Sequence, residues 1–281
     1  LRQGGKSFPT TLEKGEPPTI NRPQTPQAPF PYTSRDVEYN NPEDGTSFAG
    51  TLTIPSGEGP HPVVLLITGS GSQDRDETIF QHKPFWVIAD HLTREGVAVL
   101  RVDDRGVGGS TGVRDDLTTL TFAGDVSCGL DFLKQQPEID PQNMGLIGHS
   151  EGGIIAPIVA SQRDDVAFIV LLAGTGVNGF DVLLRQNEDI YRAAEVSEEQ
   201  IEKLLLHYRN AMDPTIQTDD EYERAKLLTQ VQLEINQTEL PEEELEKAIQ
   251  ELITIKNLPW MQTFMTLEPA DYLSKVSSPV L

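Results

Sequence analysis

The sequence predicts an α/β fold, with a mostly parallel sheet and helices on both faces. Several continuous aliphatic runs have the length of buried strands, which a parallel sheet needs because both of its faces are covered. Segments with helical periodicity separate these runs, and this alternation is typical of α/β proteins. The strands are expected at residues 63–68, 97–102, 144–147 and 166–172. The helices are expected at residues 85–94, 122–135 and 154–160.

The N-terminal part of the chain predicts an extended arm and then a hairpin. Residues 1–33 are rich in Pro, Gly and Thr, so we expect a linker there, or the remnant of an N-terminal β domain. Two β-prone runs, 36–41 and 50–54, flank a turn at 41–45 and predict a hairpin at a sheet edge. The α/β core is then expected over residues 34–176.

The composition of the sequence changes after residue 173. Residues 181–257 contain 19 Asp or Glu against 8 Lys or Arg, which is half of the chain's net charge, and their apolar residues recur at helical spacing. Ser197, with Gln200 three residues later, marks one helix start. We expect three or four amphipathic helices that form a cap inserted over residues 177–268. Residues 269–281 then return to the core, where 279–281 open another strand.

Composition excludes some classes of partner. The formal net charge of −22 argues against nucleic acid and anionic membrane surfaces, because phosphate binding needs clustered Lys and Arg. No apolar run approaches the roughly 18 residues of a transmembrane helix, and Leu1 opens no signal-peptide pattern, so we expect a soluble protein. Cys128 is the single cysteine; it cannot form an internal disulfide and is expected in the core.

The strongest chemical signal is a G-x-S-x-G motif at residues 148–152. It follows the apolar run 144–147 and precedes the predicted helix at 154–160, which is the strand, turn and helix context that this motif requires. Ser150 at the tip of such a turn is our candidate nucleophile. Gly148 and Gly152 are expected to leave room for the neighbouring backbone, with His149 and Glu151 on either side of the serine.

A glycine-rich loop, residues 68–72, follows the first core strand. In an acyl-transfer enzyme this loop and the residue after the nucleophile hold a tetrahedral oxyanion with backbone N–H groups. We assign the N–H groups of Ser70 and Glu151, with Gly71 as the alternative to Ser70. The charged string at 73–77 is expected to brace the same rim. A plain strand-to-loop turn is the alternative interpretation of the glycines.

Three other patterns compete with this site. A second G-x-S-x-G at 108–112 lacks a following helix, so we interpret it as a turn that borders the site. A G-x-G-x-x-G string at 174–179 lacks the second strand of a dinucleotide fold and is interpreted as the exit into the cap. Ser150, Asp181 and His207 have the chain order of a catalytic triad, but His207 falls within a predicted cap helix.

These residues resemble the α/β-hydrolase superfamily, and within it bacterial esterases of the EstD type, related to the serine aminopeptidase-like and dienelactone hydrolase-like groups. The resemblance runs through residues 22–24, 67–77, 103–112, 148–153 and 259–280. It implies the α/β-hydrolase fold, a helical cap, and a carboxylesterase that acts on short acyl esters without cofactor or metal. Within that fold a serine peptidase or a thioesterase is the alternative, and the acidic cap disfavours anionic acyl-CoA.

The resemblance also implies what this chain lacks. The catalytic Asp and His of such enzymes would follow Leu281, after the strand that residues 279–281 open. We therefore expect a fragment, inactive by itself, whose missing C-terminal segment is a possible partner chain. A homo-oligomer is also possible, and a non-catalytic binding module is the alternative from another functional class. The compartment stays open between the bacterial cytoplasm and periplasm.

Overall fold

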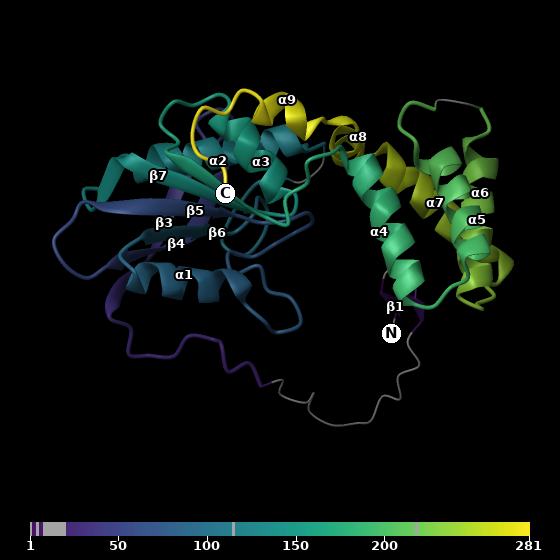
Figure 1. Ribbon diagram of the computed structural model, residues 1–281, viewed down its shortest axis with the longest axis horizontal. Coiled ribbons are helices and arrows are strands. Elements are labelled where there is room, and N and C mark those ends of the chain that lie inside the picture. Colours follow the sequence, from purple (N-terminus) through teal and green to yellow (C-terminus); the bar gives the residue numbers. More distant parts are fainter. Residues whose placement is uncertain (1, 4–5, 8–20, 114–115, 217–218) are drawn as a thin grey trace. The chain divides into compact units, whose positions relative to one another are not determined.

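The chain divides into two compact units (Figure 1). The computed structural model describes residues 2–3, 6–7, 21–113, 116–216 and 219–281. One unit holds residues 19–176 and 268–281, and the other holds residues 177–267 with the N-terminal 1–18. In the second unit β1 (Arg2–Gln3) pairs antiparallel with β2 (Lys6–Ser7). Residues 1, 4–5 and 8–20 of the arm expected over 1–33 lie outside the described residues, and 21–31 contain no helix or strand.

The first unit is built on a six-stranded mixed sheet in the order β3-β4-β6-β5-β7-β8. Its strands are β3 (Tyr32–Asn40), β4 (Ser47–Pro55), β5 (His61–Ile67), β6 (Ala98–Val102), β7 (Ile139–His149) and β8 (Phe168–Leu172). Strand β4 is antiparallel to both β3 and β6, whereas β6, β5, β7 and β8 are parallel. This arrangement confirms the predicted fold class, including the hairpin at the sheet edge.

Helices cover both faces of this sheet, as Figure 1 shows. Helix α1 (Pro84–Arg94) packs on one face, where Phe85 and Ala89 are buried against β5 and β6. Helices α2 (Thr119–Leu133) and α3 (Gly152–Ala160) pack on the other face, with the short α9 (Pro269–Leu273) against α3. Helix α2 begins three residues before its predicted start, because Thr118 caps its N-terminus.

The C-terminal residues extend the sheet beyond β8. The backbone N–H groups of Ile169 and Leu171 donate to the carbonyls of Pro279 and Leu281, and Val280 bridges Ile169 in the parallel direction. Residues 279–281 therefore take up the position of a next parallel strand, as the sequence predicted.

The second unit is helical and has its own hydrophobic core. Its helices are α4 (Gly179–Ala193), α5 (Glu198–Met212), α6 (Glu221–Ile235), α7 (Glu242–Asn257) and α8 (Pro259–Thr266). Leu204, Leu228 and Tyr208 are among the buried side chains that join α4, α5 and α6. Ser197 caps α5 by accepting a hydrogen bond from the Gln200 N–H, as its spacing predicted. Within the described residues, no helix has the length and apolar character to cross a membrane.

A buried ion pair attaches α2 to the turn that follows β6. The Arg105 side chain is 4% exposed, and its guanidinium donates to both carboxylate oxygens of Asp125 on α2, whose side chain is 11% exposed. Asp44 and Thr46, in the turn of the β3–β4 hairpin, also accept from Arg105. One guanidinium therefore holds together three segments that are distant in the sequence.

Replacement of Asp125 by alanine tests this connection. Because it leaves the Arg105 charge buried without its main partner, Asp125→Ala should lower the free energy of unfolding by about 3–5 kcal/mol in urea titrations. Asp131→Ala is the matched control on the same helix: Asp131 pairs with Arg163 but is 60% exposed, so its loss should be at most about 1 kcal/mol. Equal losses in the two variants would contradict a special role for the buried pair.

Candidate functional site

Ser150 lies at the tip of a sharp turn between β7 and α3. Its φ of +52° is in the left-handed region, which residues other than glycine rarely adopt without support from the surrounding structure. The Ser150 N–H donates to the carbonyl of Leu172 at the end of β8 (2.9 Å), and the Gly153 N–H donates to the Ser150 carbonyl (2.9 Å). These bonds hold the serine, half-buried, at the carboxyl edge of the parallel strands.

The flanking glycines are required by close backbone contacts. A Cβ atom on Gly152 would lie 2.3 Å from the carbonyl oxygen of Ile67, at the end of β5. A Cβ atom on Gly148 would lie 2.0 Å from the carbonyl oxygen of Gly152. Real Cβ atoms do not approach backbone so closely, so any other residue at either position would displace the turn.

The glycine-rich loop after β5 lies directly against Ser150. A Cβ atom built on Gly69 would be 3.3 Å from the Cβ of Ser150. The Gly69 N–H is already bonded to Glu77 Oε1 (2.8 Å), so it is not a free donor. Ser70 is exposed, and its N–H makes no hydrogen bond with any residue that the structure describes. Gly71 follows with a φ of +100°.

Glu151 starts α3 immediately after Ser150. Its side chain is buried, and its carboxylate accepts a hydrogen bond from the Thr119 hydroxyl (2.8 Å) on α2. The side chain is therefore tied to the neighbouring helix, and the backbone N–H is the group that Glu151 would offer to a reacting substrate. The fold brings the predicted oxyanion residues, Ser70 or Gly71 and Glu151, to the same edge of the sheet as Ser150.

A buried carboxylate, that of Glu77, connects the loop to the turn. Glu77 is 7% exposed, has a φ of +51°, and accepts from the Gly69 N–H while its Oε1 lies 2.7 Å from His149 Nδ1. The sequence indicated only that the 73–77 string braces this rim. It gave no sign that the last residue of the string is buried and contacts the residue before Ser150.

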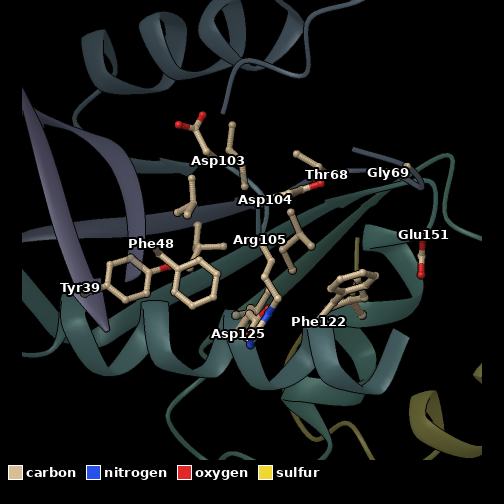
Figure 2. A pocket seen from close by; sticks show the side chains of 17 residues that line it. Tyr39, Phe48, Thr68, Gly69, Asp103, Asp104, Arg105, Phe122, Asp125 and Glu151 are labelled. Carbon is tan, nitrogen blue, oxygen red and sulfur yellow. The ribbon is translucent and has the colours of Figure 1, made fainter. Parts of the chain in front are cut away.

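A cavity of about 70 Å³ opens inward from these segments, and Figure 2 shows its lining. Gly69 and Glu151 lie at one end, and the aromatic rings of Tyr39 and Phe48 lie at the other. Aliphatic side chains of β5 and the ring of Phe122 fill much of the wall between them, with the Arg105–Asp125 pair on the α2 side. Burial raises the pKa of Tyr39, so its phenol stays neutral. The cavity is narrow and largely apolar.

Two aspartates after β6 fix the loops around this cavity. Asp104 accepts from the Thr68 hydroxyl (2.7 Å) and the Gln73 N–H (2.9 Å). Asp103 pairs with Arg75 (2.7 Å) and accepts from the Gly109 N–H. Burial acts to raise the pKa of Asp103, but the hydrogen bonds from Arg75 outweigh it and hold that pKa below its usual range. Both carboxylates serve as anchors for backbone.

The second G-x-S-x-G motif has a structural role. Ser110 is buried, donates its hydroxyl to the Asp103 carbonyl (2.7 Å) and accepts from the Ala49 N–H (2.9 Å). Its hydroxyl thus fastens the turn after β6 to β4, in agreement with the interpretation of this motif as a bordering turn.

The G-x-G-x-x-G string leads into the helical unit, and Asp181 and His207 lie within it. The Asn178 side chain caps α4 by accepting from the Asp181 N–H (2.9 Å), and a Cβ atom on Gly179 would lie 2.4 Å from the Phe264 ring. The G-x-G-x-x-G string therefore ends in a capped, closely packed helix start. Asp181 and His207 lie on α4 and α5. Over the described part of the chain, no cluster of three or more His, Cys, Asp or Glu could hold a metal ion.

Comparisons with known proteins place this geometry among hydrolases. A family model described as X-Pro dipeptidyl-peptidase (S15 family) matches residues 44–280. Esterase EstD of Thermotoga maritima is 35% identical over 145 residues, which cover 50% of this chain and 33% of EstD. The chain thus spans about a third of that relative's length.

Solved structures show the fold. The α/β hydrolase GrgF from a Penicillium species aligns with a TM-score of 0.52 and 17% identity, over 88% of this chain and 78% of its own. A hypothetical protein of Pseudomonas aeruginosa aligns with a TM-score of 0.53 and 17% identity, over 93% and 81% of the two chains. The six-stranded unit has the α/β-hydrolase fold, as the resemblance implied.

The Glu77 bridge can be tested by amide exchange at Gly69. Glu77→Ala removes the acceptor of the Gly69 N–H, so that amide should exchange about tenfold to a hundredfold faster, as the loss of a buried hydrogen bond predicts. Glu77→Gln keeps an acceptor oxygen and should stay near the wild-type rate. Mass-spectrometric exchange on the peptide that contains Gly69 measures both. Unchanged exchange in Glu77→Ala would show that the loop is held by other contacts.

Proposed function

The chain belongs to the X-Pro dipeptidyl-peptidase (S15) family, and from this membership we propose that it forms the catalytic core of a serine hydrolase acting on short acyl esters. The observation that carries the proposal is the contact of two backbone segments. Ser150, in its left-handed turn, lies against Gly69 in the loop that carries the predicted oxyanion donors. A nucleophile next to such donors is the arrangement that acyl transfer requires.

The reaction would proceed through an acyl-enzyme. The Ser150 hydroxyl attacks the ester carbonyl, a base takes its proton, and the carbonyl oxygen becomes an oxyanion held by the N–H groups of Glu151 and Ser70, or of Gly71 in place of Ser70. The alcohol leaves with a proton from that base. Water then attacks the acyl group, releases the acid and regenerates the serine.

The base and its carboxylate are proposed to follow Leu281 in the complete protein. In α/β hydrolases the triad has the chain order serine, acid, histidine. Residues 279–281 pair with β8, the strand whose end holds the Ser150 N–H, so a segment that continues there would run toward the same edge of the sheet. Among the described residues no side chain is hydrogen-bonded to the Ser150 hydroxyl.

The size of the cavity supports a short acyl chain. The space of about 70 Å³ lies next to Gly69 and Glu151 and is lined mainly by apolar side chains and aromatic rings. A cavity of this volume accommodates a few carbon atoms, and its aromatic end at Tyr39 and Phe48 blocks a longer chain. We propose acetyl to butyryl esters as the preferred class.

Labelling with a fluorophosphonate tests the nucleophile. Ser150→Ala should abolish labelling, whereas Ser70→Ala should retain it, because Ser70 is proposed to act through its backbone N–H, which alanine also has. Labelling is to be compared in residues 1–281 and in a chain that continues past Leu281, where a supplied base should raise the rate by several orders of magnitude. No labelling in the longer chain would sink the proposal and favour a non-catalytic binding module.

A peptidase is the second candidate, because the matched family is described by its X-Pro dipeptidyl-peptidase activity. The esterase and peptidase hypotheses are distinguished by comparing kcat/KM for p-nitrophenyl butyrate with kcat/KM for an X-Pro p-nitroanilide, both measured on the longer chain. We expect the ester to be preferred by at least about a hundredfold, since an anilide is the poorer leaving group and needs further positioning. A preference for the anilide would assign the chain to the peptidases; a thioester control with butyryl thiocholine tests the thioesterase alternative.

A further inference from the structure

A second pocket lies on the α1 face of the sheet, and no step of the proposed reaction uses it. It has a volume of about 280 Å³. Strands β3, β4 and β6 form its floor, and α1 and the loop before it form its rim. Its lining includes Phe30, Asp76, Lys83, Trp86 and Arg101.

Two cations in this pocket share one carboxylate. Arg101 and Lys83 share a single carboxylate, that of Asp76, whose two oxygens each accept from one of the cations. Arg75 has its own partners in Asp103 and in Asp36, and the Asp36 side chain is 87% exposed. The Asp76, Lys83 and Arg101 group therefore has a net charge of +1. The adjoining Arg75 has two carboxylate partners, so an anion is favoured only beside Arg101 and Lys83.

Arg101 leaves one edge of its guanidinium unused. The side chain is 5% exposed, and its Nη1 donates to Asp76. Its Nε is buried without a hydrogen-bond partner, and its Nη2 has none among the described residues. Burial lowers the pKa of this guanidinium, the expected result where a buried cation lacks compensation. The Nε and Nη2 groups form the planar fork that binds carboxylate with two parallel hydrogen bonds.

Aromatic rings line the same pocket. Phe30 stacks on Tyr32 with a centroid distance of 5.3 Å and lies 6.4 Å from the Trp86 ring, while Lys83 Nζ is 5.3 Å from the Trp86 centroid. An inorganic anion would leave these rings in water. A ligand with a flat apolar group beside its negative charge would contact both the rings and the cations.

We propose that this pocket binds a small aryl or similarly flat carboxylic acid. The carboxylate takes the free edge of Arg101 and the charge of Lys83, and the ring packs against the Phe30 and Trp86 rings, which already contact each other. The site shares no lining residue with the cavity beside Gly69 and Glu151, and its occupancy does not depend on whether the chain is a hydrolase.

Equilibrium binding of benzoate tests the proposal. In a Trp260→Phe background Trp86 is the sole tryptophan, so its emission reports the site, and calorimetry gives the stoichiometry. Benzoate should bind saturably at one site. Lys83→Met, and Arg101→Lys, which keeps the charge but loses the fork, should each weaken binding on the order of tenfold, as loss of one charge-assisted hydrogen bond predicts. Arg35→Gln, at an exposed pair with Glu138 that lines another pocket, should leave binding unchanged.

Related ligands separate the contributions. Benzyl alcohol lacks the charge and acetate lacks the ring, so both should bind at least about tenfold more weakly than benzoate. Equal binding of benzyl alcohol would overturn the role of the cations, and equal binding of acetate or inorganic phosphate would overturn the role of the rings. Arg101→Lys alters a buried pair, so if the Arg101→Lys variant fails to fold, the Lys83→Met variant tests the proposal. Undiminished binding of benzoate by Lys83→Met would overturn the site.

Discussion

The structure depends on a backbone crossing at the end of the parallel strands. The turn after β7 passes so close to the end of β5 that Gly152 meets the Ile67 carbonyl and leaves no space for a side chain. This crossing forces Ser150 into a left-handed conformation, and it places Gly69 against the serine. The position of the candidate nucleophile and that of the loop proposed to hold the oxyanion are thus two results of one close contact.

Buried and half-buried carboxylates keep that contact in place. Loops at the carboxyl edge of a parallel sheet have few backbone partners of their own, so side chains must satisfy them. Glu77 holds the Gly69 N–H, Asp104 holds the Gln73 N–H, and Asp103 holds the Gly109 N–H. The strongly acidic composition therefore has an internal role in this unit in addition to its effect on the surface.

The charged string at residues 73–77 contacts both the Ser150 turn and the pocket on the α1 face. Glu77 points to the Ser150 turn, whereas Asp76, the residue before it, points to Arg101 and Lys83 on the α1 face. The chain turns at residues 75–76 and Glu77 has a φ of +51°, so the two neighbouring side chains point in different directions and one short loop can organise two cavities. A ligand at the Arg101 pocket would contact the loop that also braces the candidate nucleophile.

The sequence by itself determined the α/β class, the strand and helix alternation, the Ser150 turn and the separate acidic helices. Each of these is a local pattern of apolar spacing, glycine placement or capping residues, which acts within a few residues of chain. The predicted boundaries of the helices were less exact, since α2 begins at a capping residue that the apolar pattern did not reveal.

Only the tertiary structure decided which polar residues meet. Glu77 and His149 are 72 residues apart, and Arg105 and Asp44 are 61 apart. Nothing in the local sequence shows that Glu77 and Arg105 are buried in these pairs, whereas many other charged side chains are exposed. The choice of Gly69 as an occupied donor and the unused edge of Arg101 likewise emerge from packing. The reason is physical: a charge is tolerated inside a protein only where distant segments converge to pair it, and that convergence belongs to the fold.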